Sequence, residues 1–170
     1  EQQRLSLQIK QRYQSGALLF YLGDAKSLKL MHGAKAEISC HAATLLLQVP
    51  QASQLTDQDY LRQQLHTWFR KETQTMVTNL CDQWGALMGY MPRSVKVRRY
   101  RARWGCCRRN GDLTFHDLLS MATLPVIEYV VIHELAHLKH MNHSPEFWQW
   151  VAKHQPHYKA QMAWLRTHQY

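Results

Sequence analysis

Two histidines and a glutamate, His133, Glu134 and His137, stand close together in the pattern HExxH. On an α-helix, residues four apart lie on one face, one turn above the other. Two imidazoles placed in this way can reach one metal ion at about 2.0–2.1 Å, and the glutamate can take a proton from a water molecule at that ion. The pattern therefore predicts a zinc-dependent hydrolase site, with His133 and His137 as ligands and Glu134 as the catalytic base.

The segment around this pattern is typical of a helix, since residues 128–139 contain neither glycine nor proline. Its apolar residues recur at helical spacing, at Ile127, Val131, Leu135 and Leu138. We expect this apolar face to meet the core and the two histidines to lie on the opposite side. The alternative is a pair of ordinary core histidines, which would leave the ligand spacing and the adjacent glutamate unexplained.

A third ligand has two candidates, His140 on the same helical face and His143 beyond it. Ser144 and Pro145 are typical of the N-cap and first position of a new helix, so the first helix should end between the two candidates. His140 lies about 10 Å along the axis from His133, which suits a tetrahedral ion poorly. The sequence favours His143 as the ligand, and His140 then faces the substrate, supports the ligands or simply ends the helix.

The net charge of +9 is concentrated in one stretch, because residues 93–109 carry eight basic side chains and no acidic one. Such a strip can contact nucleic acid through phosphates or an acidic protein, and it can equally be a solvated strand edge. The candidate contacts with substrate or nucleic acid are Arg98, Arg99, Arg101, Arg103, Trp104 and His140.

The four cysteines form no CxxC pair and predict neither a disulfide framework nor a cysteine-rich metal site. Free thiols are typical of a reducing compartment, so we expect a cytoplasmic protein. No apolar run approaches the roughly 18 residues of a membrane span, so no membrane partner is expected. The chain begins at Glu1, and whether a leader precedes it is open.

The remaining pattern predicts an N-terminal β-rich section over residues 1–50 and a second part over 51–170. Strands are expected at residues 5–9, 17–22, 27–32, 36–41 and 44–49. A long helix should cover 56–88 with Thr56 as its N-cap. A strand at 95–103, a turn at 107–111 and a returning strand at 112–116 form a β-hairpin. Helices follow at 117–121, from Pro125, at 144–154 and from Pro156 to about 168.

Several segments together resemble the YgjP-like metallopeptidase family (DUF45), which is related to the SprT-like and WLM zincins. They are Arg103-Trp104-Gly105-Cys106-Cys107, Gly111-Asp112-Leu113, residues 129–138 and His143-Ser144-Pro145-Glu146-Phe147-Trp148. The resemblance is strong over residues 93–155 and looser over 4–92. It departs from the usual pattern at Cys106, His116 and Thr123, where Ser, Asn and Pro are more common; a surface position is expected for His116.

This resemblance implies an α+β, zincin-like metallopeptidase domain in which residues 51–170 form the catalytic core, and we expect this core to form one compact unit with the β-rich section of residues 1–50. It also implies one Zn²⁺ per chain, held by His133, His137 and His143, with Glu134 as the base. Peptide-bond hydrolysis through a metal-activated water is then the expected reaction, and a protein or peptide is the expected substrate. An extended substrate could pair with the strand at 95–103 or at 112–116. The alternative is a basic nucleic-acid-associated binding module whose zinc site is structural or cryptic.

Overall fold

The computed structural model describes residues 12–168, which form a mixed α+β fold with two separate sheets and confirm the predicted fold class. The predicted strand at residues 5–9 lies outside the described residues. In chain order the elements are β1 (Leu18–Tyr21), β2 (Asp24–His32), β3 (Glu37–His41), β4 (Thr44–Val49), η1 (Ala52–Leu55), α2 (Gln58–Met88), β5 (Ser94–Arg98), β6 (Gly105–Cys107), β7 (Asp112–His116), η2 (Leu119–Met121), α3 (Leu124–Ala136), α4 (Pro145–His154) and α5 (Tyr158–Thr167).

The first sheet has the strand order β1-β2-β4-β3, in which β2 and β4 run parallel and the other neighbours run antiparallel. Alternation in β4 places Leu45, Leu47 and Val49 on one face, and all three are fully buried. This face packs against the N-terminal half of α2, so the β-rich section has a core of its own.

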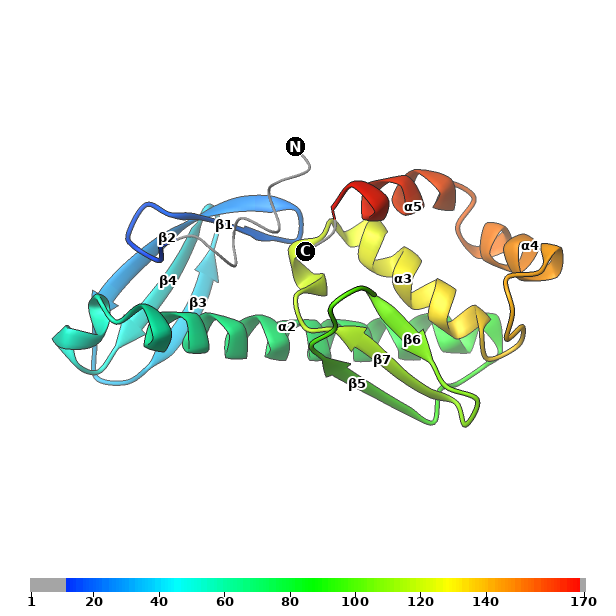
Figure 1. Ribbon diagram of the computed structural model, residues 1–170, viewed down its shortest axis with the longest axis horizontal. Coiled ribbons are helices and arrows are strands. Elements are labelled where there is room, and N and C mark those ends of the chain that lie inside the picture. The colour runs from blue at the N-terminus through cyan, green and yellow to red at the C-terminus, as the bar shows by residue number, and fades with distance from the viewer. Residues whose placement is uncertain (1–11, 169–170) are drawn as a thin grey trace.

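The long helix α2 has 31 residues, a length of roughly 46 Å, and runs below the first sheet and behind the second sheet in Figure 1. Its N-cap is Asp57, so the predicted cap at Thr56 is wrong by one residue. The reason is that the Asp57 carboxylate accepts hydrogen bonds from the backbone N–H groups of Asp59 and Tyr60, at 3.1 and 3.0 Å. The helix ends at Gly89, whose φ of 76° is the left-handed conformation that glycine adopts without a Cβ clash.

The second sheet corrects the predicted hairpin, because its order is β5-β7-β6. The hairpin joins β6 to β7 through the turn after Cys107, whereas β5 lies parallel to β7 on the other side. The predicted strand at 95–103 stops at Arg98. Residues 99–104 instead fold over the end of β7, where the carbonyls of Tyr100 and Trp104 accept hydrogen bonds from the ring and the backbone N–H of His116.

Two hydrophobic cores share α2 along its length. Leu65 and Phe69 belong to the core of the first sheet, while Val77 and Cys81, further along α2, belong to the core beneath α3. The second sheet, α3 and α4 complete that second core, with α5 packed against α3. Across residues 12–168, every helix is too short or too polar to cross a membrane.

Candidate metal centre

The helix that carries the first histidine, α3, lies at the centre of the second core. It starts after Thr123, with Pro125 in its first turn, and nine of its 13 residues are buried. A helix that is apolar on nearly all sides is buried on nearly all sides, so the predicted division into one core face and one histidine face is too simple. The side chain of His133 is partly exposed, and the neighbouring Glu134 is only 6% exposed.

The end of α3 positions the second histidine. The helix stops at Ala136 and His137 is its C-cap, one turn earlier than the predicted end between His140 and His143. Tighter bonds close this turn, since the backbone N–H groups of Leu138 and Lys139 each bond a carbonyl three residues earlier. The chain then reverses, and Ser144 begins α4 as predicted, with its hydroxyl accepting from the N–H of Phe147 at 3.4 Å.

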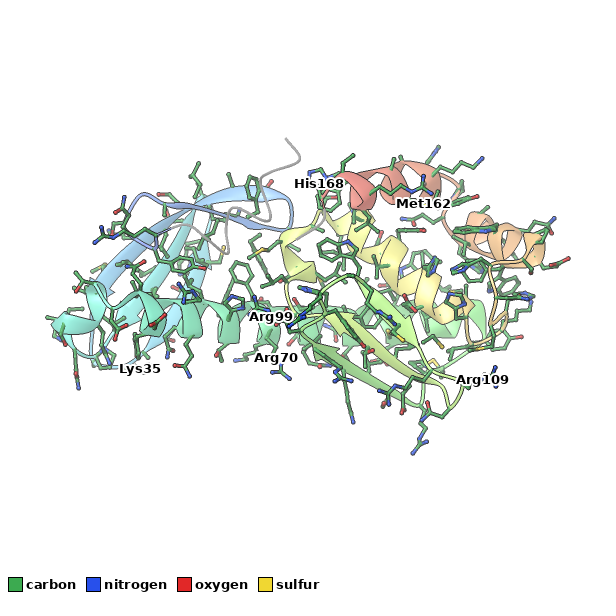
Figure 2. All side chains as sticks on the ribbon, in the orientation of Figure 1. Lys35, Arg70, Arg99, Arg109, Met162 and His168 are labelled. Carbon is green, nitrogen blue, oxygen red and sulfur yellow. The ribbon has the colours of Figure 1, made fainter. Side chains whose placement is uncertain are left out.

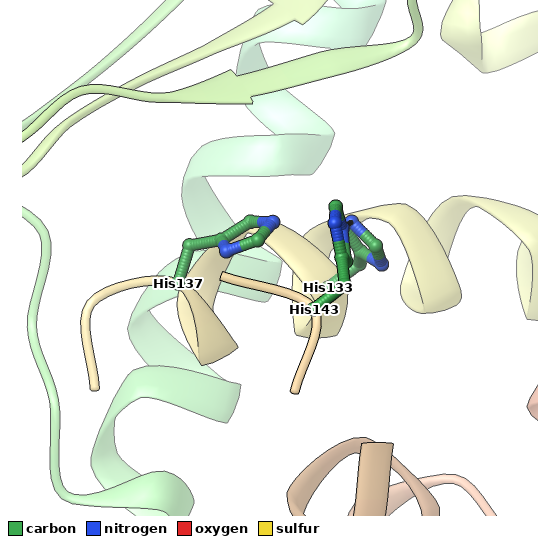
Figure 3. Close-up of side chains that lie close together, drawn as sticks. All are labelled: His133, His137 and His143. Carbon is green, nitrogen blue, oxygen red and sulfur yellow. Dashed lines mark hydrogen bonds between the residues drawn. The ribbon is translucent and has the colours of Figure 1, made fainter. Parts of the chain in front are cut away.

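This reversal brings three imidazoles together (Figure 3). One ring nitrogen from each of His133, His137 and His143 lies within 4.8 Å of the others, and no second group with metal-ligand chemistry occurs among the described residues. The Nε2 atoms of His133 and His143 are 3.0 Å apart. The side chain of His140 does not belong to this group.

Two of these rings have a hydrogen-bond partner at Nδ1. His137 Nδ1 lies 3.0 Å from the backbone carbonyl of His140, an acceptor, so Nδ1 carries the proton and Nε2 keeps its lone pair. His133 Nδ1 faces the hydroxyl of Tyr129 at 3.4 Å. Metal-binding histidines in proteins are usually oriented by such contacts to the outer ring nitrogen.

The protonation of the rings also suits a metal ion. Burial, together with the neighbouring His137 and His143, lowers the pKa of His133 to about 3, because a positive charge there is poorly solvated and lies close to other imidazoles. Burial likewise lowers the pKa of His137, although the hydrogen bond from its ring to the His140 carbonyl acts in the opposite direction and raises it. The rings of His133 and His137 are therefore neutral near pH 7, which is the form that binds a metal. Three imidazoles at this spacing fit zinc, and a catalytic zinc site with three protein ligands keeps its fourth position for water or substrate.

An aromatic wall supports the three rings from α4 and α5. Phe147 stacks on His137 with ring centroids 4.5 Å apart, and Trp148 stacks on His143 at 5.5 Å. Tyr158 stacks in turn on Trp148 at 5.4 Å. Phe147 and Trp148 stand within the sequence pattern that follows His143, but nothing in residue type alone indicated that they pack on the histidines.

Glu134 projects toward β6, the short edge strand of the second sheet. Burial raises the pKa of its carboxyl group to about 8, while a hydrogen bond from the backbone N–H of Cys107 and the charge of Arg103 oppose the rise. The approach is so close that a Cβ on Gly105 would lie 2.5 Å from a carboxylate oxygen of Glu134. A cavity of about 150 Å³ opens here, lined among others by Trp104, Gly105, His133 and Glu134.

Basic residues of the segment 93–109 line separate hollows of the surface. Arg103 acts on Glu134, and Trp104 lines the cavity beside it. Arg101 lines a second hollow, toward α5. Arg98 lines a third hollow of about 320 Å³, together with Arg70 of α2 and other residues of the sheet. The strip is thus divided among separate surfaces, and nucleic-acid binding through it stays a prediction.

His116 and Arg99, two residues singled out in the sequence, lie outside the group of three histidines. His116 is 2% exposed and packs on Trp104, so the expected surface position is wrong; its ring is held by backbone groups at the end of β7. Arg99, also in the loop before β6, lies at the edge of the second sheet near α2 (Figure 2). Burial lowers the pKa of His66, and the charge of Arg99 lowers it further.

Comparison with known proteins adds a family. A family model described as "YgjP-like, metallopeptidase domain" matches residues 1–168. No curated protein matches the sequence. Among solved structures, the crystal structure of the metallopeptidase zymogen of Pyrococcus abyssi abylysin is similar, with 26% sequence identity and a TM-score of 0.49. The match covers 55% of this chain and 99% of that one.

Proposed function

Because the chain belongs to the YgjP-like metallopeptidase family, whose model matches nearly all of it, we propose that it cleaves peptide bonds with a zinc ion held by His133, His137 and His143. Glu134 is the general base in this proposal. The observation that carries it is the convergence of three ring nitrogens within 4.8 Å beside a buried carboxyl group. A metallopeptidase acts on proteins or peptides, and that is the substrate class.

The zinc ion would lower the pKa of a water molecule and polarise the scissile carbonyl. Glu134 accepts the proton of that water and delivers it to the leaving amine. Its pKa of about 8 reflects burial, and a divalent cation held by the three histidines would favour the charged form and lower this pKa. The hydrogen bond from the N–H of Cys107 and the charge of Arg103 both favour the ionised carboxylate that a general base requires.

An extended substrate has one suitable strand near this site. The strand β7, one of the two predicted partners, hydrogen-bonds β5 on one side and β6 on the other, so it has no free edge for a substrate. The other predicted partner, the strand at 95–103, is β5 in the structure. It lies on the side of β7 opposite β6. The strand β6 is the edge that packs against α3, with Gly105 touching Glu134, and it is the strand on which a substrate backbone would lie beside the metal.

The test is the metal content of protein purified without added metal, measured by elemental analysis together with peptide cleavage. We expect about one zinc per chain in the wild type and in His140→Ala, and loss of zinc in His143→Ala. Glu134→Gln should keep its zinc and lose roughly 10²–10⁴-fold in kcat, the usual contribution of a general base. Zinc that is insensitive to His143→Ala would contradict the ligand set, and full turnover in Glu134→Gln would contradict the base.

A further inference from the structure

A second hollow adjoins the cavity at Glu134. It has a volume of about 280 Å³. It is lined by Arg101, Ala102, Trp104, Tyr129, Met162, Leu165 and Arg166. Trp104, Tyr129 and Leu165 line both spaces, so a substrate bound at the metal centre has this hollow as its immediate neighbour.

The hollow combines apolar walls with two positive charges from different parts of the chain. Arg101 comes from the loop between β5 and β6, and Arg166 comes from the last turn of α5, which packs against α3. None of the lining residues is acidic, and among residues 12–168 neither guanidinium forms an ion pair with a carboxylate. Arg166 makes a weak contact from Nη2 to the Met162 sulfur at 3.8 Å, which leaves donors on its planar fork for a ligand.

Two guanidinium groups that form no ion pair within residues 12–168, beside indole, phenol and aliphatic surface, are suited to one chemical group. A carboxylate accepts paired hydrogen bonds from an arginine fork, and a charge-assisted bond is stronger where nearby apolar walls exclude water. The methylene groups that carry an acidic side chain would pack on Leu165 and Met162 while its carboxylate meets the two arginines.

We propose that this hollow is a specificity subsite that binds a carboxylate of the substrate next to the scissile bond. The carboxylate belongs either to an aspartate or glutamate side chain or to the free C-terminus of the substrate. The inference rests on the proposed peptidase function, since it takes its meaning from the adjacent His133 and Glu134.

The first test measures binding alone, with the zinc-loaded Glu134→Gln protein, so that cleavage is not required. Short neutral fluorescent peptides carry one Glu, Gln or Lys at successive positions, each with a free or an amidated C-terminus, and fluorescence anisotropy gives Kd. At one of these positions, we expect the Glu peptide to bind roughly tenfold or more tightly than the Gln peptide, because a charge-assisted hydrogen bond is stronger than a neutral one. If only the free C-terminus matters, the carboxylate is the terminal one. Equal binding of all peptides, or no binding, would overturn the subsite.

The second test uses charge reversal in the otherwise active protein. Arg101→Glu and Arg166→Glu should each reverse the preference, so that the Lys peptide is bound and cleaved better than the Glu peptide. Arg101 lies in an exposed loop, so its variant keeps the test open if Arg166→Glu fails to fold. Arg109→Gln is the matched control, since it removes a positive charge from the tip of the β6–β7 hairpin, away from Met162 and α5 (Figure 2).

The two proposals fail in different ways. Selective binding of the Glu peptide without cleavage of any peptide by the wild type would contradict the hydrolase and leave the subsite standing. Cleavage that is indifferent to Glu, Gln and Lys, and unchanged by both charge reversals, would contradict the subsite and leave the hydrolase standing.

Discussion

At the scale of single residues, the contact between Gly105 and Glu134 shows how one absent side chain defines the site. A hydrogen in place of a Cβ lets β6 approach the carboxyl group of α3 directly, so that the N–H of Cys107 can bond it. The same closeness removes Glu134 from water and raises its pKa. The position of the proposed base therefore depends on a residue that carries no functional group of its own.

We predict that Gly105→Ala loses activity while keeping zinc. The new Cβ would lie 2.5 Å from the nearest Glu134 oxygen, and the carboxylate must shift to avoid it. A displacement of about 1 Å at a catalytic group costs on the order of a hundredfold in rate. Steady-state kinetics with elemental analysis measures both quantities.

The control is Gly33→Ala, directly after β2, where the new Cβ would meet the side chain of Gln48 at 3.3 Å. That variant should keep both zinc and turnover. Wild-type kcat in Gly105→Ala would show that the carboxylate does not act from the position seen here.

At the scale of secondary-structure elements, the site depends on where two helices end and begin. The early stop of α3 at Ala136 leaves His137 at the C-cap, and the cap of α4 at Ser144 holds His143 next to it in sequence. The first turn of α4 then supplies Phe147 and Trp148 as packing for the rings. A change in either boundary would move one histidine relative to the other two.

We predict that Ser144→Ala weakens metal binding as well as folding. The lost cap should reduce the free energy of unfolding by about 1 kcal/mol, because the N–H of Phe147 loses its acceptor. Fraying of the first turn of α4 would also loosen His143, so zinc affinity should fall in a competition titration with a chromogenic chelator. Urea unfolding measures the stability of the same samples.

Asp57→Ala provides the comparison, because Asp57 caps α2 at the end remote from the histidines. It should cost a similar free energy of unfolding and leave the zinc affinity unchanged. Equal zinc affinities in the two variants would mean that the α4 cap does not hold His143 in place.

At the scale of the whole molecule, α2 links the two cores mechanically. Between them, the hydroxyl of Thr73 on α2 donates to the Asp117 carbonyl and also contacts Ser120, in a fully buried position. Trp104 and Trp164 pack against both cores. We propose that the β-rich section and the catalytic part fold as one cooperative unit, because neither core can be exposed without breaking the helix that both use.

We predict that Leu47→Ala, in the core of the first sheet, lowers the stability of the distant histidine site. Leu47 is fully buried, and such a truncation costs about 2–5 kcal/mol. Thermal unfolding followed by far-UV circular dichroism and by zinc release should shift together and remain a single transition. Zinc release at the wild-type temperature, with a separate early transition of the first sheet, would show two independent units.

The sequence by itself determined the features that depend on neighbours a few residues apart. The HExxH spacing, the Ser144–Pro145 helix start, the long helix and the strand at 44–49 follow from periodicity and capping, which are local. The sequence pattern also sufficed for the family, since the resemblance on its motifs is confirmed by a match over residues 1–168.

Only the tertiary structure decided what touches what across the chain. The tertiary structure set the parallel pairing of β5 with β7, the burial of His116, the aromatic wall on the histidines and the two arginines of the hollow next to Glu134. Each of these features joins segments far apart in sequence. Such contacts arise from packing of the shared cores, for which residue spacing carries no signal. For the same reason Gly105 gave no sign, from its type alone, that it would rest against the carboxyl group of Glu134.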